Sequence, residues 1–240
     1  MSRITNFMDR VLYPDFDGNW DDDLFRELIL DKIQFEYRCL DYGAGRGNVE
    51  QMNFKGIAKF IAGIDPEEDV LSNPYLDEAK QIDLTNNIIP YADNSFDLVF
   101  SDNVMEHIQS PSIVLKEINR VLKPGGVFLS KTPNKWHYMP VIARLTPTWF
   151  HRLYNKLRGR KTFDTFPTAY KLNSSRTVRK HAKEAGFSVT QIQLIEGRPE
   201  YLRLTALTYF FGFLYERIVN KIALFRTFRC VMISELEKPP

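Results

Sequence analysis

The chain has 240 residues, a length typical of one large domain or of one domain that carries an insertion. Apolar residues make up 44% of the sequence and charged residues 26%, which excludes a disordered or fibrous protein. Residues 1–110 hold 22 acidic and nine basic side chains, whereas residues 111–240 hold eight acidic and 23 basic ones. The second half therefore either attracts an anionic partner or presents a solvated basic face.

Short apolar segments alternate with helical patterns over the first two thirds of the chain, which predicts an α/β fold around a parallel sheet. The segment after Asp21 has the pattern of an amphipathic helix. Strands are expected at residues 37–40, 58–64, 81–84, 96–100 and 127–130, with a short polar helix up to about Phe54. A helix over 112–122 is expected to end at Pro124-Gly125-Gly126, where glycine can adopt a left-handed cap.

The last third of the chain has a different composition. Residues 134–172 are rich in aromatic, proline and basic residues and show no strand alternation. A helix is expected at 174–185 and strands at 187–195 and 225–236, with an aromatic helical stretch at 201–223 between the two strands.

The sequence favours a cytoplasmic protein. Cys39 and Cys230 lack the CxxC spacing of a thiol or zinc site, and both lie in apolar runs, so we expect them to be reduced and buried. The first residues show no apolar signal segment. The longest uncharged apolar-rich run, Leu204 to Tyr215, is shorter than the ~20 residues that span a bilayer.

A glycine-rich turn carries the chemistry. A strand ending at Asp41 is followed by Gly43, Gly45 and Gly47, and a second strand ends at Asp65, which is the layout of a nucleotide site. A tight turn without a ligand would have the same pattern. The glycine spacing differs from that of a dinucleotide fingerprint, and no Gly-Lys-Ser/Thr follows, which excludes a P-loop. Asp41 would repel a pyrophosphate but attract an ammonium and a sulfonium, which favours S-adenosylmethionine.

Residues 41–47 resemble motif I of the class I S-adenosylmethionine-dependent methyltransferases of the type 11-like group. Residues 63–66, 82–108 and 115–134 resemble the family's later motifs in the same order. The resemblance covers about residues 35–134. It implies a single Rossmann-like domain over 1–240, with a doubly wound sheet of seven mostly parallel strands, an antiparallel last strand and helices on both faces.

The resemblance also implies which residues bind the cofactor. Asp41 would orient the amino group, Asp65 would hold the ribose, and Asp83 would approach the adenine. The full implied set is Asp41, Gly43, Ala44, Gly45, Asp65, Pro66, Asp83, Leu84, Ser101 and Asn103. Arg46 and Tyr42 are bulkier than the family's usual residues, and Arg46 would either pair with the methionine carboxylate or face solvent.

Methyl transfer from a sulfonium is an in-line displacement that depends mainly on alignment and needs no metal. His137, just after the fifth predicted strand, is the best-placed candidate base, and Tyr138 is a candidate positioning residue. Ser101-Asp102-Asn103-Val104 lacks the Asn-Pro-Pro-aromatic sequence typical of methyltransferases that act on base amino groups. An oxygen or carbon acceptor is therefore favoured, with oxygen preferred.

Three segments extend beyond the matched motifs. Residues 1–34 are expected to form a helical cap, 135–172 a basic aromatic insert that covers the active site, and 199–225 an apolar helical insert between the last two strands. The basic insert favours an acidic, sugar-like or lipid-like acceptor, or an acidic membrane surface. The apolar insert could line a substrate pocket, form a homodimer face, lie in a lipid interface or pack in the core.

Small-molecule methylation is thus the preferred function. RNA methylation is an alternative because basic and aromatic residues are interleaved in the second half, yet no recognised RNA-binding module is present. A non-catalytic S-adenosylmethionine-binding regulator is a further alternative, since no base is obligatory in the motifs.

Overall fold

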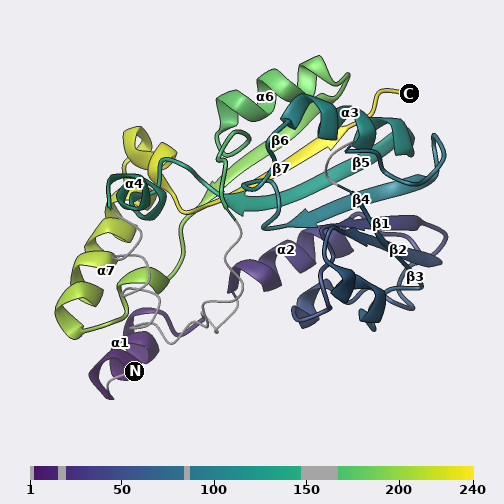
Figure 1. Cartoon of the computed structure of the whole chain (residues 1–240). Helices are drawn as coiled ribbons and strands as arrows, with labels where there is room; N and C mark the ends of the chain where they lie inside the picture. Colours follow the sequence, from purple (N-terminus) through teal and green to yellow (C-terminus); the bar gives the residue numbers. More distant parts are fainter. Residues whose placement is uncertain (1–2, 16–19, 84–86, 147–166) are drawn as a thin grey trace. The chain divides into compact units, whose positions relative to one another are not determined.

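The computed structural model describes residues 3–15, 20–83, 87–146 and 167–240. The chain forms two compact units, each assembled from stretches that are far apart in the sequence (Figure 1). The sheet unit comprises Asp22–Thr132, Thr168–Gln193 and Met232–Pro240. The helical unit comprises Met1–Asp21, Pro133–Pro167 and Leu194–Val231.

A seven-stranded sheet has the order β3-β2-β1-β4-β5-β7-β6. The strands β3, β2, β1, β4 and β5 pair in parallel. Beside β5, the N–H of Gly125 donates to Lys238 at 2.8 Å and that of Asn134 to Cys230 at 2.7 Å, so β7 runs antiparallel. The strands are β1 Arg38–Tyr42, β2 Phe60–Asp65, β3 Glu78–Gln81, β4 Phe96–Asp102, β5 Leu122–Pro133, β6 Ser188–Ile195 and β7 Val231–Glu237. The predicted Rossmann-like sheet with an antiparallel last strand is confirmed.

Helices cover both faces of this sheet, with α3 and α6 on one face and α2 on the other (Figure 1). Ser174 and Thr205 begin α6 and α7 with reciprocal capping boxes. The α-helices are α1 Arg3–Leu12, α2 Trp20–Leu30, α3 Pro111–Val121, α4 Tyr138–Leu145, α6 Ser175–Glu184 and α7 Ala206–Lys221. Short 3₁₀ helices are η1 Glu50–Met52, η2 Glu68–Ser72, η4 Glu200–Leu202 and η5 Ala223–Phe228.

The core lies in the central strands, whose side chains are buried on both faces. Leu40, Ile61 and Phe100 are fully buried, and the Phe100 ring packs edge-on against Phe54 with centroids 5.1 Å apart. Burial on both faces is what a parallel sheet between two helical layers requires. Among the described helices, none has the length and apolar character needed to cross a membrane.

The polar helix predicted to follow the glycine turn is wrong, because only the three residues of η1 are helical there. Val49 and Asn53 are extended on either side of it. The Arg26 guanidinium donates hydrogen bonds to the carbonyl oxygens of Gln51 and Asn53 at 2.5 and 2.8 Å. These carbonyl groups therefore accept from a side chain instead of from the backbone N–H groups of a helix. The chain therefore crosses this segment without a regular helix.

The Pro-Gly-Gly segment does not cap α3, contrary to the sequence prediction. The helix ends at Val121, and Leu122 is already extended. Pro124 disfavours helical geometry in the residue before it, and Gly125 pairs with Lys238. This segment therefore belongs to the start of β5.

Two strands lie elsewhere than predicted. β3 ends at Gln81 instead of beginning there, because Glu78 is in register with Ala62 of β2. β7 begins only at Val231, after η5. Leu84 and residues 147–166, which include most of the predicted basic insert, lie outside the described residues.

Candidate functional site

The glycine turn that follows β1 is held against β2. Gly43 has a φ of +86°, and the N–H groups of Gly43 and Ala44 donate to the Ile64 carbonyl at 2.8 and 3.1 Å. A Cβ on Gly43 would lie 2.2 Å from Cγ2 of Val104, and one on Gly63 would lie 2.9 Å from the Ala44 Cβ. Glycine is therefore favoured at Gly43 by the backbone angle and the nearby Val104 side chain, and at Gly63 by the close approach of Ala44.

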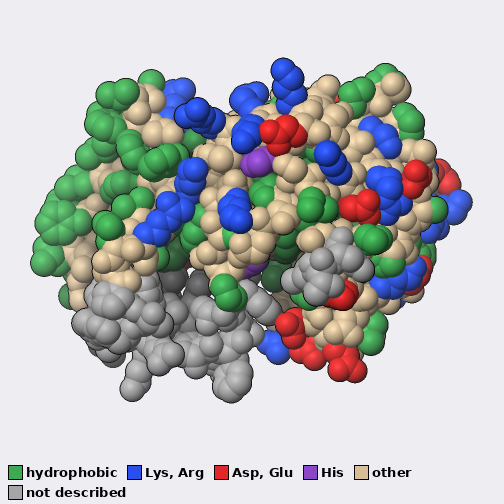
Figure 2. All heavy atoms as spheres, turned by 45° about the horizontal axis from the view of Figure 1, so that its top comes forward, with side chains coloured by type: hydrophobic (Ala, Val, Ile, Leu, Met, Phe, Trp, Pro, Cys, Tyr) green, Lys and Arg blue, Asp and Glu red, His purple; other side chains and the backbone are tan. Residues whose placement is uncertain are grey.

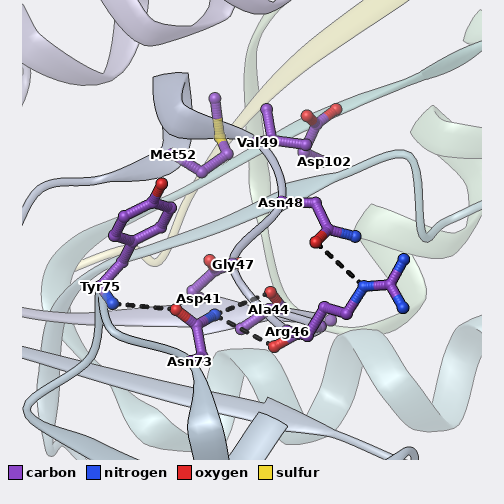
Figure 3. Close-up of a pocket in the computed structure, with 12 residues that line it drawn as sticks. Asp41, Ala44, Arg46, Gly47, Asn48, Val49, Met52, Asn73, Tyr75 and Asp102 are labelled. Atoms are coloured by element: carbon purple, nitrogen blue, oxygen red, sulfur yellow. Dashed lines mark hydrogen bonds between the residues drawn. The ribbon is translucent and has the colours of Figure 1, made fainter. Parts of the chain in front are cut away.

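Asn73, which lies 29 residues after Ala44 in the sequence, holds the turn through hydrogen bonds of its side chain, an arrangement that we call the Asn73 clamp (Figure 3). Its side-chain amide donates to the carbonyl oxygens of Ala44 and Gly45, both at 3.0 Å, and its Oδ1 accepts from the Tyr75 N–H at 2.9 Å. A Cβ on Gly47 would lie 2.6 Å from this Oδ1. Sequence reasoning missed Asn73, whose one signal is the turn-forming pair that it makes with Pro74.

The turn borders a cavity of about 160 Å³ in the sheet unit. Gly45 has a φ of +50°, and a Cβ on it would meet no protein atom within 4 Å, so this side of the turn is open. Asp41 and Asp102 line the cavity from the ends of neighbouring strands (Figure 3). The lining residues are Asp41, Gly43, Ala44, Gly45, Arg46, Gly47, Asn48, Val49, Met52, Asn73, Tyr75 and Asp102.

Carboxyl groups lie close together at the cavity. Burial raises the pKa of the Asp41 carboxyl well above its usual range, and the nearby carboxylates of Asp102 and Asp65 raise it further. Burial also raises the pKa of Asp65, against the opposing effect of the Glu67 and Gly45 N–H groups, which donate to it at 2.9 and 3.0 Å. A cationic ligand would relieve the repulsion among these carboxylates. The site therefore fits a group that carries an ammonium and a sulfonium.

Asp102 is held by a buried lysine. The Lys131 side chain is fully buried, and its Nζ lies 3.0 Å from Oδ1 of Asp102. The same Nζ forms an ion pair with Asp22 of α2. The two carboxylates compensate the buried ammonium, and the arrangement fixes one wall of the cavity. The sequence pattern did not indicate either Lys131 or Asp102 as part of the site, because an alternating strand pattern says nothing about a buried ion pair.

The cavity thus brings together Asp41, Gly43, Ala44 and Gly45 of the predicted cofactor residues. Ser101 does not line it, because its buried hydroxyl donates to the Tyr42 carbonyl at 2.9 Å. Asp65 acts on the turn from the end of β2, through the bond from the Gly45 N–H.

Three further predicted residues lie beyond the lining. Asn103 is exposed with a φ of +53°, and its N–H donates to the Lys131 carbonyl at 2.9 Å. Pro66 is half-buried, and its carbonyl accepts from Gln81 at 2.8 Å, whereas Asp83 is exposed.

His137, the predicted base, is part of the helical unit and lies in a buried cluster of rings. Its side chain is 1% exposed, and its Nδ1 accepts from the Met139 N–H at 3.5 Å at the start of α4. The ring centroid lies 4.0 Å from that of Tyr138 and 5.7 Å from that of Tyr215. Its Nε2 is 3.7 Å from Oε2 of Glu196. The predicted catalytic residues His137 and Tyr138 are therefore neighbours.

Burial sets the charge state of this cluster. It lowers the pKa of His137 to about 3 and raises that of Glu196 to about 8, so both are neutral at pH 7. Donor atoms of His137, Glu196 and Cys230 lie within 4.8 Å of one another, a spacing that could suit a metal ion. The contact from the Met139 N–H to Nδ1, at 3.5 Å, favours the tautomer of His137 that carries its proton on Nε2. A metal ion at this position would have to displace that proton and the proton of Glu196.

A family model described as a methyltransferase domain matches residues 40–130, the span from β1 to β5 that holds the glycine turn and the cavity. This segment, which is less than half of the chain, is similar to the class I S-adenosylmethionine-dependent methyltransferases. The sheet order and the antiparallel β7 of this methyltransferase agree with that family's fold, as the resemblance implied.

Two curated relatives illustrate the likeness. This chain is 29% identical over 147 residues to the sterol 4-C-methyltransferase strm-1 of Caenorhabditis elegans. The match covers 52% of this chain and 44% of the relative. It is also 30% identical over 106 residues to a ubiquinone biosynthesis O-methyltransferase of Neisseria meningitidis. That match covers 41% of this chain and 44% of the relative. The chain spans less than half the length of each of them.

The fold is also shared with a protein named for another reaction. The crystal structure of the cyclase SpnF superposes with a TM-score of 0.57 at 17% identity, covering 94% of this chain and 85% of that one. At this identity the likeness shows the fold alone, and a fold does not fix the reaction.

Proposed function

We propose that this methyltransferase transfers the methyl group of S-adenosylmethionine to a small-molecule acceptor. The observation that carries the proposal is the cavity beside the glycine turn, where the buried carboxyl of Asp41 lies near those of Asp102 and Asp65. S-adenosylmethionine brings an ammonium and a sulfonium, which are the charges that such a site stabilises. The cofactor supplies an activated methyl group, and the chain binds it and aligns the acceptor.

The individual residues are proposed to act as the family resemblance implies. Asp41 would orient the ammonium, and the open side of Gly45 leaves room for the methionine part. Asp65 with Pro66 would hold the ribose, and Asp83 with Leu84 the adenine. Ser101 and Asn103 would act near the methionine end through the backbone. These assignments rest on the family resemblance, and Asp41, Asp65 and Ser101 lie in the last residues of β1, β2 and β4.

An oxygen acceptor of apolar, lipid-like character is the finer part of the proposal. The end of β4 lacks the Asn-Pro-Pro-aromatic sequence that would favour a base amino group. The two relatives named above act on a sterol and in ubiquinone biosynthesis, which supports an apolar acceptor. Sugar-like or acidic acceptors remain alternatives that a product screen separates.

His137 and Tyr138 stay our candidate catalytic residues. A pKa of about 3 makes His137 a weak base, so we expect alignment to contribute more to the rate than proton abstraction. His137→Gln tests this: a base role predicts a loss of roughly 10²–10⁴-fold in kcat. A change of less than tenfold in kcat, with the acidic limb of the pH profile unchanged, would leave His137 a packing role.

Cofactor binding is tested first, by calorimetry with S-adenosylmethionine and with its demethylated product. Asp41→Asn removes the carboxylate that faces the ammonium, and we expect it to weaken binding by roughly 10–100-fold, since hydrogen bonds to charged groups contribute about 1.5–3 kcal/mol. Asp69→Asn, a substitution at an exposed site in η2, is the matched control. Absence of binding heat in the unsubstituted protein would overturn the proposal.

Methyl transfer itself is tested with cofactor labelled in the methyl group, against aqueous and lipid fractions of a cell extract. The proposal expects label in a small molecule. Label in RNA would instead support the basic second half as an RNA-binding region. Tight cofactor binding without any labelled product would favour a regulator or a non-methylating reaction, which the fold likeness to a cyclase makes a specific alternative.

A further inference from the structure

Helix α7 exposes large apolar side chains along one side. Leu207, Phe211 and Ile218 are 66%, 57% and 45% exposed. At 3.6 residues per turn, the exposed apolar side chains occupy an arc of about 100°. The opposite side of the helix is buried. The exposed members are Leu207, Phe210, Phe211, Leu214 and Ile218, and the buried ones are Tyr209, Gly212, Glu216 and Val219.

The packed side of α7 is firmly held within the helical unit. A Cβ on Gly212 would lie 2.7 Å from Cβ of Pro199, so the helix approaches the residues before η4 closely. The Tyr209 hydroxyl donates to Asp9 of α1 at 2.7 Å, and the Tyr13 hydroxyl donates to Glu216 at 3.0 Å. The exposed side is therefore presented by a helix that is already fixed, and binding to it requires no refolding.

The apolar surface continues from α7 into η5, which packs against it. Leu224 is 78% exposed there. We name this surface the α7–η5 face, formed by Leu207, Phe210, Phe211, Leu214, Ile218, Ile222, Leu224, Phe225 and Phe228. An apolar surface of this extent is rare on a protein that contacts only water, and it indicates an interaction.

The exposed charges on this face are basic. Arg217, Lys221 and Arg226 are exposed, and the first two lie at one edge of the apolar arc of α7. Residues 205–229 contain one acid, Glu216, whose carboxylate is buried and accepts from the Asn220 side chain at 2.7 Å. Figure 2 shows hydrophobic side chains gathered on the helical unit with Lys and Arg side chains among them.

We propose that the α7–η5 face binds the surface of an anionic lipid bilayer. Apolar and aromatic side chains would lie at the level of the headgroups, while Arg217, Lys221 and Arg226 would contact lipid phosphates. α7 has 16 residues, so it would lie in the interface and not cross the bilayer. A second copy of this chain fits less well, because a two-fold contact through one patch would oppose basic residues to each other.

Vesicle co-sedimentation of the full chain tests the proposal. We expect binding to phosphatidylcholine vesicles that contain about a third phosphatidylglycerol, weaker binding in raised salt, and little binding to pure phosphatidylcholine. Lys221→Gln with Arg226→Gln should lower the partition coefficient roughly 30-fold, since each basic residue near an anionic surface contributes about 1 kcal/mol. Phe211→Ser with Leu214→Ser should lower it by roughly tenfold or more.

Lys116→Gln with Arg179→Gln is the matched control, because it removes two exposed positive charges from the sheet unit. Circular dichroism of every variant establishes that it is folded. Absence of binding to the anionic vesicles at low salt would overturn the proposal, as would equal losses in the control and in the Lys221 and Arg226 pair. Self-association that Phe211→Ser with Leu214→Ser abolishes, without vesicle binding, would assign the face to a second copy.

Discussion

The two units of this protein differ in which apolar and charged side chains they bury and which they expose. In the sheet unit the apolar side chains of β1, β2 and β4 are buried on both faces, and Lys131 is buried between two carboxylates. In the helical unit α7 leaves five large apolar side chains exposed beside basic ones. The sheet unit therefore buries the apolar side chains of its central strands, whereas α7 of the helical unit leaves a row of apolar side chains exposed along one side.

Lys131→Met should break the sheet unit's internal charge balance most severely. It leaves the half-buried carboxylates of Asp22 and Asp102 without their ammonium, and removing one partner of a buried ion pair costs about 3–5 kcal/mol. Urea denaturation measures the loss. Lys123→Met is the control, since Lys123 pairs with Asp97 at 2.7 Å but its side chain is 42% exposed, and we expect a loss of about 1 kcal/mol or less. Equal losses would contradict the role of burial.

Gly43→Ala should follow in size. The new Cβ would overlap Val104 and would also occupy a backbone conformation with a φ of +86°, so we expect about 2–4 kcal/mol of lost stability together with loss of cofactor binding. Gly56→Ala is the matched control, because its φ is +81° but no atom lies within 4 Å of the new Cβ. Thermal unfolding and cofactor titration measure both effects. A Gly56 variant as damaged as the Gly43 variant would show that backbone strain, and not the contact, decides.

Glu196→Gln should change how the helical unit responds to pH. The folded protein retains the Glu196 proton up to a pKa of about 8, whereas the unfolded chain releases it near 4.5. Stability therefore falls as pH rises through this window. His137, Tyr215, Cys230, Glu216 and Arg229 are the titratable groups around this carboxyl.

The variant should lose this fall, which we expect to be of the order of 4 kcal/mol between pH 5 and 9, at about 1.4 kcal/mol per pH unit. Denaturation at several pH values measures it, with the exposed substitution Glu50→Gln as control. A stability profile of Glu196→Gln that parallels that of the unsubstituted protein would show that the carboxyl is already ionised in the fold.

Tyr13→Phe should have the smallest effect and tests whether the units depend on each other. It removes the hydrogen bond to Glu216, which we expect to cost about 1–2 kcal/mol in the helical unit. Cofactor affinity in the sheet unit should stay within about twofold. Tyr37→Phe serves as the control. A tenfold change in cofactor affinity would mean that packing of α1 on α7 is transmitted to the cavity.

The sheet unit could be predicted largely from the sequence. Apolar runs bounded by Asp41, Asp65 and Gly126 indicated strands, because burial on both faces demands continuous apolar residues. The glycine spacing indicated the turn, and the family resemblance implied four of the residues that line the cavity. The predicted helix after Gly47 failed because Arg26, distant in the sequence, binds the carbonyl groups of Gln51 and Asn53.

The rest of the site depends on contacts that leave no local pattern. In the sequence Lys131 has the pattern of an ordinary strand residue, and only the folded position of α2 brings Asp22 beside it. The position of His137 after the fifth strand predicts a general base, but burial among Tyr138 and Tyr215 lowers its pKa and keeps the imidazole neutral. The late start of β7 likewise reflects side chains, since Asn134 and Tyr215 bind the carbonyl groups of residues 227–229.

The Asn73 clamp limits how far the glycine turn can be moved between proteins. The heptapeptide from Asp41 to Gly47 depends on a residue outside it, because two of its carbonyl oxygens accept hydrogen bonds from the side chain of Asn73. Grafting those seven residues onto another strand would transfer the sequence of the turn without the Asn73 hydrogen bonds that hold its conformation. A transplant that retains cofactor affinity should need the stretch from β1 through Tyr75 as one piece.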